Sequence, residues 1–413
     1  MKRLFTNTSS VPEKYRNVFR HLFFDIGWFG VLNGSTIAFL SIYATRLGAT
    51  GTQIGLIGAT PAIINLIFAL PAGAWLGKRR LDRSIFWAAL IHRLFYALLI
   101  PLPFLFLPAT QVWLIIVVTL VMNIPGTAIG VGFTALFAGA VPPAWRGYVA
   151  GIRNAAFAVT QIATSLICGW ILISLPRDQG YAIVFAIGFV GAMMSAFHLF
   201  FVHPIEEEQI ITPSDEALDV VDDQPTVNGF SFSILKGRFG RIILLLFCFH
   251  LAQYLAIPVF PLYTVNIAKF SDQVLSLGSA LFYVAVFIGS LQLNGLSKKL
   301  GNRVIMGCGV VILGLYPLLL SFTHDVLLYL VTSIVGGFAW SMCGGALYNY
   351  LLEFIPDNQR PAHMAWYNLI LNAAILLGSL GGPEIATVIG LPAALVLFGI
   401  LRGLAGVAIL RWG

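Results

Sequence analysis

Residues 111–140 read QVWLIIVVTLVMNIPGTAIGVGFTALFAGA and carry no Asp, Glu, Lys or Arg. A helix needs about 20 apolar residues to cross the hydrocarbon core of a bilayer. The whole chain has this character, because 58% of its 413 residues are hydrophobic and only 10% are charged. Soluble domains carry about 25% charged residues. The composition therefore excludes soluble, disordered, fibrous and disulfide-scaffold classes and indicates an integral membrane protein.

Eleven further segments resemble this stretch in length and hydropathy. Many contain Gly and Pro, which membrane helices tolerate better than soluble helices. Together the segments predict an all-α integral membrane protein with twelve transmembrane helices, numbered here as spans one to twelve. The spans are expected at residues 19–44, 52–76, 84–107, 111–140, 147–174, 180–202, 240–264, 273–294, 303–322, 325–351, 362–386 and 391–411.

The positions of Lys and Arg predict how the spans are oriented, because cytoplasmic loops are enriched in these residues. With both termini inside, the inner segments carry nineteen Lys and Arg, whereas the outer loops carry three, Arg46, Arg177 and Lys269. We therefore expect a multi-pass protein of the inner (plasma) membrane with both termini cytoplasmic. The first span is longer than the apolar core of a signal peptide and is expected to be retained.

The net charge of +7 is unevenly distributed along the chain. Residues 204–235 contain eight acidic residues and no Lys or Arg, so the rest of the chain carries 24 basic and nine acidic residues. Those basic residues lie in short clusters between apolar runs, as topology signals do, and they do not indicate a nucleic-acid partner. The acidic segment is predicted to be a flexible linker.

Motifs for nucleotide, metal or nucleophile chemistry are missing from the sequence. The closest match to a Walker loop, residues 72–79, has Ala72 at its first position and Arg79 at its last. The four Cys are scattered through apolar runs and lack zinc-type spacing, and the chain has no Gly-x-Ser-x-Gly elbow. We therefore predict a protein that is not an enzyme and that uses no cofactor or metal.

The second half of the sequence resembles the first half when the two are aligned with an offset of 220 residues. From Pro142 onward the offset is 214 residues. These shifts predict an N-terminal six-helix bundle (1–203), an acidic cytoplasmic linker (204–235) and a C-terminal six-helix bundle (236–413). Parallel six-helix repeats are a transporter architecture with the solute site near the midplane, between the halves. Matching pairs are Asn33 with Gln253, Tyr43 with Tyr263, Lys78-Arg79 with Lys298-Lys299, Pro142 with Pro356, and Arg146 with Arg360.

These features resemble the major facilitator superfamily over nearly the whole chain. The superfamily's loop pattern is Gly-x-x-x-Asp-Arg-x-Gly-Arg-[Arg/Lys]. Residues 73–83 (GAWLGKRRLDR) keep its glycines, bases and an Asp in altered order, and residues 295–303 (GLSKKLGNR) have lost the acid. Residues 141–147 (VPPAWRG) resemble the loop between spans four and five. The resemblance implies two pseudo-symmetric six-helix bundles and a secondary active transporter that works by alternating access.

The resemblance also implies that the two basic loops act as gates. Glu353, at the end of span ten, is expected to pair with Lys298, Lys299 or Arg303. The predicted gating residues are Lys78, Arg79, Asp82, Arg83, Lys298, Lys299, Arg303 and Glu353.

The direction and the coupling of transport stay open at this point. One alternative is a proton-coupled exporter of drugs or metabolites. Its motifs are weak here, because span five contains no Pro and span four contains no Arg. An alternative of another class is a receptor or scaffold, which would be expected to carry a large soluble domain or a long structured loop. The expected partners are a small-molecule solute and the lipid bilayer, with protons as an open question, and the expected oligomeric state is a monomer.

Charged side chains inside spans need a specific explanation, because each costs about 2.5–3.5 kcal/mol on insertion scales. Asp25 in span one has two interpretations, a proton-titrating carboxylate or the partner of a base. The candidate bases are Arg153, which is expected at comparable depth, and Arg93, which is expected deeper but is long enough to reach Asp25. Arg402 in span twelve is expected to reach the membrane interface and anchor the helix there.

The solute site is predicted from the superfamily's cavity-lining spans, which are one, four, seven and ten. Polar and aromatic residues on those spans are candidates, although each could instead form a hydrogen bond between helices. Asn33 and Gln253 stand out because they are equivalent in the repeat. The predicted solute-binding residues are Asn33, Asn123, His250, Gln253, Tyr254, Trp340, Tyr348 and Asn349.

Overall fold

The computed structural model describes residues 11–204, 232–356 and 359–413, and all of the secondary structure in these residues is helical. Most of the predicted acidic linker therefore lies outside the described residues. The elements are α1 (Glu13–Leu32), η2 (Asn33–Ile37), α2 (Ala38–Arg46), α3 (Gly51–Gly77), α4 (Leu81–Leu94), η3 (Phe95–Leu99), α5 (Leu102–Leu105), α6 (Pro108–Ala140), α7 (Pro143–Ser174), α8 (Arg177–Phe200), η4 (Phe232–Leu235), α9 (Arg238–Ala256), α10 (Val259–Asn266), α11 (Asp272–Leu300), α12 (Asn302–Ser321), α13 (Val326–Leu352), α14 (Arg360–Ile389) and α15 (Leu391–Trp412).

Within the described residues, twelve helical segments are long and apolar enough to cross a membrane, and they coincide with the twelve predicted spans. This confirms the predicted fold class. Spans one, three and seven are each assembled from more than one element: α1, η2 and α2 in the first, α4, η3 and α5 in the third, and α9 with α10 in the seventh.

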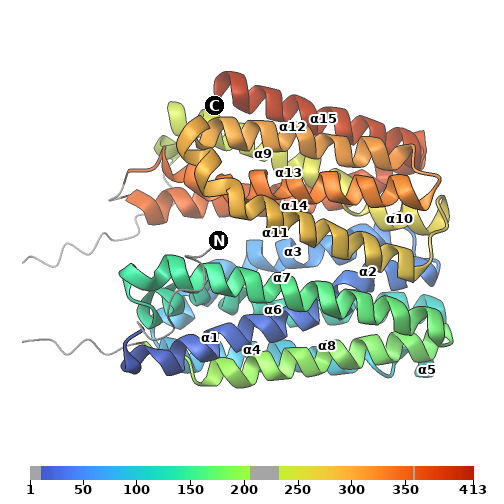
Figure 1. Cartoon of the computed structure of the whole chain (residues 1–413), viewed down its shortest axis with the longest axis horizontal. Coiled ribbons are helices and arrows are strands. Elements are labelled where there is room, and N and C mark those ends of the chain that lie inside the picture. The colour runs from blue at the N-terminus through green and yellow to red at the C-terminus, as the bar shows by residue number, and fades with distance from the viewer. Residues whose placement is uncertain (1–10, 205–231, 357–358) are drawn as a thin grey trace, which may run out of the picture.

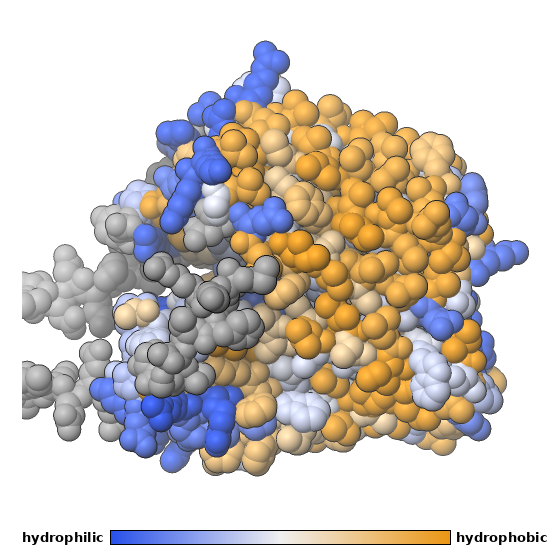
Figure 2. Space-filling view, viewed as in Figure 1, coloured by the Kyte–Doolittle hydropathy of each residue, from blue (hydrophilic) through white to orange (hydrophobic). Residues whose placement is uncertain are grey.

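The surface carries a broad apolar band between two polar ends (Figure 2). Large apolar side chains such as Trp113, Leu70 and Leu404 are 53%, 67% and 59% exposed. Continuous apolar surface of this extent is unfavourable in water, which leaves the hydrocarbon of a bilayer as its environment. One polar end holds the basic loops at residues 78–83 and 298–303 and is called the basic end. The other holds Arg46 and Arg177 and is called the opposite end.

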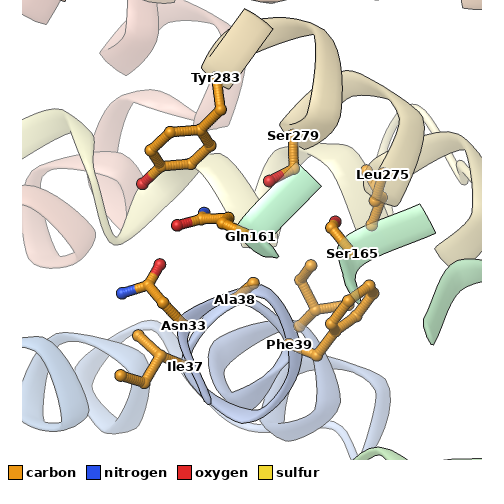
Figure 3. Close-up of a pocket in the computed structure, with 10 residues that line it drawn as sticks. Asn33, Ile37, Ala38, Phe39, Gln161, Ser165, Leu275, Ser279 and Tyr283 are labelled. Atoms are coloured by element: carbon orange, nitrogen blue, oxygen red, sulfur yellow. The ribbon is translucent and has the colours of Figure 1, made fainter. Parts of the chain in front are cut away.

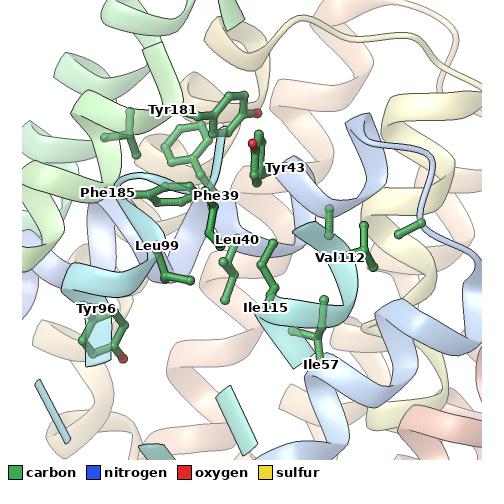
Figure 4. Close-up of a cluster of buried hydrophobic side chains, with 14 of the residues drawn as sticks. Phe39, Leu40, Tyr43, Ile57, Tyr96, Leu99, Val112, Ile115, Tyr181 and Phe185 are labelled. Carbon is green, nitrogen blue, oxygen red and sulfur yellow. The ribbon is translucent and has the colours of Figure 1, made fainter. Parts of the chain in front are cut away.

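The helices form two groups (Figure 1). Elements α1–α8 make one bundle and α9–α15 make the other, with both described chain ends toward the basic end. The bundles meet mainly where α3 packs on α14 and α7 packs on α11. The first bundle has an aromatic core in which the Tyr43 ring lies 4.4 Å from that of Tyr181 and 5.3 Å from that of Phe185, between centroids (Figure 4).

Both bundles interrupt their first span at the same point of the repeat. In the first bundle the interruption is the π-helical turn η2, at residues 33–37. In the second it is the break between α9 and α10, before Pro258, and the 220-residue shift carries residues 33–37 onto 253–257. π-helical turns such as η2 are frequent at functional sites.

Equivalent residues on spans six and twelve pack against these two interruptions. Gly188 of α8 lies so close to η2 that a Cβ atom there would overlap the Thr36 hydroxyl. The 214-residue shift places Arg402 of α15 at the matching position beside the second break. Arg402 donates from Nη2 to the Gln253 carbonyl oxygen at 3.1 Å and from Nη1 to that of Leu313 at 3.2 Å.

The prediction that Arg402 reaches the membrane interface is therefore wrong. Its side chain is buried, with an exposed fraction of 1%. The reason lies in neighbouring helices, because Pro317 has no N–H to bond the carbonyl of Leu313, four residues earlier. Arg402 supplies the missing donor, as neighbouring side chains do for interrupted membrane helices.

The two bundles touch closely at the opposite end. A Cβ on Gly169 of α7 would overlap the Ser276 hydroxyl of α11, and a Cβ on Gly55 of α3 would overlap the Ser379 carbonyl oxygen of α14. Small residues permit such backbone approach in membranes. A larger residue at either position would hold the two helices further apart.

Five turns closer to the basic end, the same helix faces are free of the partner bundle. Gly151 lies eighteen residues before Gly169, and Gly73 lies eighteen residues after Gly55, which returns each to the same face at 3.6 residues per turn. A Cβ on Gly151 would meet nothing within 4 Å, and one on Gly73 would meet only Val131 of its own bundle at 3.9 Å. The bundles therefore converge at the opposite end and diverge toward the basic end.

Candidate functional site

A cavity of about 280 Å³ lies between the bundles, beside the π-helical turn. Its polar lining comes from Asn33 at the start of η2, from Gln161 and Ser165 on α7, and from Ser279 and Tyr283 on α11. The side-chain ends of Asn33, Gln161 and Tyr283 point toward one another across it (Figure 3). Three helices from both bundles thus converge on one polar space, which we call the polar cavity.

The Gln161 amide is a deeply buried polar group of this cavity. The residue is 1% exposed, and its amide interacts with the Tyr283 hydroxyl. Its Oε1 atom accepts no hydrogen bond within the described part of the chain. A buried amide oxygen without a donor is unfavourable by roughly 1–3 kcal/mol, so this atom is prepared to receive a donor from another molecule.

A second cavity of about 300 Å³ adjoins the first and is predominantly apolar. Ala38, Ile42, Leu275 and Ser279 line both cavities. Its remaining wall includes the broken segment of span seven, and we call it the apolar cavity. The aromatic and proline residues of that wall are Pro258, Phe260, Pro261, Phe282, Tyr316 and Tyr329.

Polar contacts between the two bundles, which we call ties, close the opposite end above these cavities. Arg46 of α2 forms an ion pair with Asp272 of α11, with Nη2 2.9 Å from Oδ1. Thr52 of α3 donates to Glu384 of α14 at 2.6 Å. Solute would therefore approach the cavities from the basic end in this conformation.

A further tie lies deeper and continues into span four. Asn65 of α3 donates from Nδ2 to Asn372 Oδ1 of α14 at 3.2 Å, and it accepts a hydrogen bond from Thr127 of α6 at 2.8 Å. Three helices from the two bundles are thereby joined by uncharged side chains alone.

Of the eight residues predicted to bind solute, Asn33 lines the polar cavity, and the other seven line neither cavity. His250 is buried with Nε2 3.2 Å from the Tyr367 hydroxyl. Asn123 donates to the Thr119 carbonyl of its own helix at 2.6 Å. Tyr254 packs against Gly378, whereas Trp340, Tyr348 and Asn349 on α13 are exposed.

Gln253 lies in different surroundings from its repeat partner. Its repeat partner Asn33 lines the polar cavity, but Gln253 is buried beside Arg402, which contacts its backbone carbonyl. The two breaks are equivalent in sequence while their surroundings differ, because Gly188 occupies the place where the second bundle has Arg402.

The prediction missed the cavity residues of α7 and α11 because it considered only spans one, four, seven and ten. A local signal was present in the sequence. Gln161 and Ser165 are four residues apart, as are Ser279 and Tyr283, and such pairs lie on one helix face. Each pair stands in an uncharged stretch of its span, where polar side chains need partners.

Asp25 lies at the centre of a buried polar cluster within the first bundle. Its Oδ1 is 3.5 Å from Arg93 Nη2 of α4 and accepts a hydrogen bond of 2.6 Å from Ser195 of α8. Its Oδ2 is 3.4 Å from Arg153 Nη1 of α7. The carboxylate thus links α1 to three other helices. Asp25, Arg93 and Arg153 are 4%, 6% and 8% exposed.

The cluster contains two guanidinium groups for one carboxylate. Arg153 also donates to the Leu22 carbonyl at 2.8 Å, and its guanidinium lies over the rings of Phe133 and Phe137, 5.0 and 5.9 Å from their centroids. Arg93 Nη1 has no hydrogen-bond partner within the described residues. Asp25 precedes Asn33 by eight residues, about 12 Å along the helix, so the cluster is separate from the polar cavity.

The basic loops differ between the two halves. In the first, Asp82 is 3.1 Å from Arg80 Nη2 and 3.0 Å from His203 Nδ1. In the second, Asn302 stands in place of this acid and donates to Glu353 at 2.7 Å. The sequence predicts a base as the partner of Glu353, but in the structure Glu353 accepts a hydrogen bond from the Asn302 amide.

The other predicted gating residues are spread over the surface of the basic end. Arg79 lies over the Trp75 ring, 5.4 Å from its centroid. Arg303 donates to the carbonyls of Leu410 and Gly413, both at 2.9 Å, and so ties span nine to the end of span twelve. Lys78, Arg83, Lys298 and Lys299 are exposed.

Comparison with known families settles the membership that the loop motifs suggested. The model of the Major Facilitator Superfamily matches residues 23–239 and 242–413. The chain belongs to the major facilitator superfamily. The resemblance stated from the sequence is thereby confirmed.

The sequence is also similar to other proteins at low identity. The quinolone resistance protein NorA of Staphylococcus aureus is 23% identical over 138 residues, which is 33% of this chain and 35% of NorA. The match thus spans about a third of the length of that relative.

Solved structures of several transporters share the fold along nearly the whole chain. The nucleoside transporter NupG has a TM-score of 0.66 at 14% identity, with 96% of this chain and 99% of that chain covered. A POT family transporter in complex with a thioalcohol-conjugated peptide has a TM-score of 0.71 at 11% identity, covering 95% of each chain. A bacterial homologue of the human lysosomal transporter Spinster, in an inward-facing and unoccupied conformation, has a TM-score of 0.69 at 14% identity, covering 97% of each.

Proposed function

We propose that this chain is a secondary transporter that carries a small solute across the membrane by alternating access. The observation that supports this most directly is the divergence of the two bundles. Gly169 and Gly55 touch the partner bundle, whereas Gly151 and Gly73 on the same helix faces do not. Rocking of one bundle against the other would close the basic end, open the opposite end and expose the cavities to the other side.

The ties at the opposite end must break in that motion. Arg46–Asp272 and Thr52–Glu384 each join one bundle to the other above the cavities. The Thr52–Glu384 contact is exposed to solvent, whereas the side chains of Arg46 and Asp272 are only 22% and 13% exposed. The Arg46–Asp272 ion pair is therefore the stronger of the two in favouring the conformation in which the opposite end is closed.

A reversible cross-link across this end tests the mechanism. In a variant without the four native cysteines, Thr52→Cys and Glu384→Cys are expected to form a disulfide on oxidation. Uptake of any solute carried in proteoliposomes should then cease and should return on reduction. Normal uptake by the fully cross-linked protein would contradict alternating access at this end.

Two controls isolate the effect of joining the bundles. The single-cysteine variants should be insensitive to oxidation. A pair within one bundle, at Ser297 and Asn302 of the second basic loop, is 2.5 Å apart between side-chain oxygens. A disulfide at that pair should leave uptake nearly unchanged.

We further propose that the basic end faces the cytoplasm of a plasma membrane and that the protein acts as a monomer. The excess of Lys and Arg in the loops of that end supports this orientation. Arg80 and Arg177 are exposed on the two ends, with side-chain exposures of 67% and 50%. In intact cells, a membrane-impermeant maleimide should label Arg177→Cys, and it should label Arg80→Cys only after permeabilisation. The reverse pattern would show the opposite orientation.

Proton coupling is a separate proposal, and export of a drug is the alternative that a match to a resistance protein suggests. The match to a quinolone resistance protein over 138 residues is the observation in its favour. Against proton coupling, Asp25 is a buried carboxylate within span one that already has two arginine partners, which suits a structural ion-pair network. Uptake measured with and without a pH gradient decides between coupled and uncoupled transport.

A further inference from the structure

We propose, on the basis of the transport function above, that the solute is an uncharged amphipathic molecule with a hydrogen-bonding head and an apolar body. The head would lie in the polar cavity against Gln161 and Asn33. The body would lie in the apolar cavity, between the wall of span seven and Phe282. Each part of this assignment follows from the lining of one cavity.

We infer that the solute is uncharged from the side chains that line the two cavities. Among the described residues, the lining of both cavities contains no Asp, Glu, Lys or Arg. An ion that moves from water into such a site without a counter-charge loses several kcal/mol of hydration. Cations and anions are therefore disfavoured relative to neutral molecules of the same shape.

The hydrogen-bonding capacity of the solute's head group is inferred from Gln161. Its Oε1 atom is buried without a partner among the described residues, so it requires a donor, and an N–H or O–H of the solute would supply one. Asn33 lies on the facing side of the cavity and offers both a donor and an acceptor. A primary carboxamide or a hydroxyl-bearing ring satisfies these groups, since either can donate and accept at once.

The apolar body of the solute is inferred from the fact that the two cavities adjoin each other. Leu275 and Ser279 line both, so a molecule held by Gln161 extends directly into the apolar cavity. There Phe260, Phe282 and Tyr316 provide aromatic surface. Apolar walls with a few convergent polar groups are the usual composition of small-molecule sites.

The test uses compounds that differ only in the charge of the head. Primary carboxamides, the matching carboxylates and the matching primary amines, each on phenyl, indole and cyclohexyl bodies, are added to the purified full-length protein. Thermal unfolding then reports binding. We expect carboxamides to raise the melting temperature, and the other two series to have little effect. Stabilisation by carboxylates or amines alone, or by none of the compounds, would overturn the inference.

Substitutions in the polar cavity then test where the head group of the solute binds. Gln161→Leu is expected to weaken carboxamide binding about fivefold, the equivalent of one hydrogen bond, and Asn33→Ala by a similar factor. Gln161→Glu should shift the preference toward the amines. If Gln161→Leu does not fold, Gln161→Asn withdraws the same amide by one methylene and should also weaken binding.

A matched control and the cross-link separate this inference from the transport proposal. Asn17→Ala removes an exposed amide of the same span as Asn33, on α1, and should bind carboxamides as the unaltered protein does. Equal binding by Asn17→Ala and all cavity variants would refute the assigned site. The disulfide experiment at positions 52 and 384 tests alternation of the bundles with any carried solute, so it can succeed while the uncharged class fails.

Discussion

Replacing Asp25 by Asn should destabilise the folded protein by about 3–5 kcal/mol, the range measured when one partner of a buried ion pair is removed. The carboxylate is 4% exposed and lies within 3.5 Å of two guanidinium groups. Its neutralisation would leave Arg93 and Arg153 buried without a counter-charge. An Asn side chain can retain the hydrogen bond from Ser195, but it cannot compensate the two positive charges.

The measurement is the yield and melting temperature of the detergent-purified protein. Asp178→Asn is the matched control, because Asp178 forms an ion pair with Arg177 in which both side chains are about half exposed. That pair should contribute at most about 1 kcal/mol. Adding Arg93→Met to Asp25→Asn should recover part of the lost stability, since one buried charge is removed with its partner.

A different result would assign Asp25 to energy coupling. In that result, Asp25→Asn is as stable as the unaltered protein while pH-driven accumulation of solute is lost. This outcome would contradict the ion-pair network as the main role of Asp25. It would support the alternative in which this carboxylate exchanges a proton during the cycle.

Replacing Gly169 by Leu should drive the protein out of the conformation described here. A Cβ at this position would overlap the Ser276 hydroxyl and lie 2.5 Å from Ser276 Cβ, on the partner bundle. Overpacking of this kind costs about 1–3 kcal/mol, which corresponds to roughly a five- to more than hundredfold change in a conformational equilibrium. The opposite end should therefore open.

Gly151→Leu should have the reverse effect. Gly151 lies on the same face of α7, five turns nearer the basic end, where an added Cβ atom would meet nothing within 4 Å. Leu fits there in the present conformation and would obstruct closure of the basic end. The two variants share one residue change and one helix, so they form a matched pair.

The rate of disulfide formation between cysteines at positions 52 and 384 measures both effects. The rate should fall in the Gly169→Leu background and rise, or stay high, in the Gly151→Leu background. Equal rates in both backgrounds would show that the bundles do not pivot between the two ends.

The sequence by itself determined the twelve spans, the pseudo-repeat and the charge asymmetry of the loops. Hydropathy is a local property that each segment carries regardless of its neighbours, and about 20 apolar residues suffice to specify a span. The stretch at 111–140 therefore indicated α6 without any knowledge of its partners. The repeat also aligned residues 33–37 with residues 253–257, and the break in span seven directly follows Ala256, at the end of the aligned segment.

Only the tertiary structure decided which faces of these helices meet. Gln161 and Tyr283 belong to different bundles, and their approach depends on how α7 crosses α11, which no local pattern records. The burial of Arg402 has the same origin, because its guanidinium donates to carbonyls on two other helices. One is the Leu313 carbonyl, for which Pro317 has no N–H, and the other is the Gln253 carbonyl at the end of α9, which also accepts from the Ile257 N–H. A bilayer specifies that a segment is a helix, whereas contacts between helices specify which side chains line a cavity, since lipid solvates every apolar face equally well.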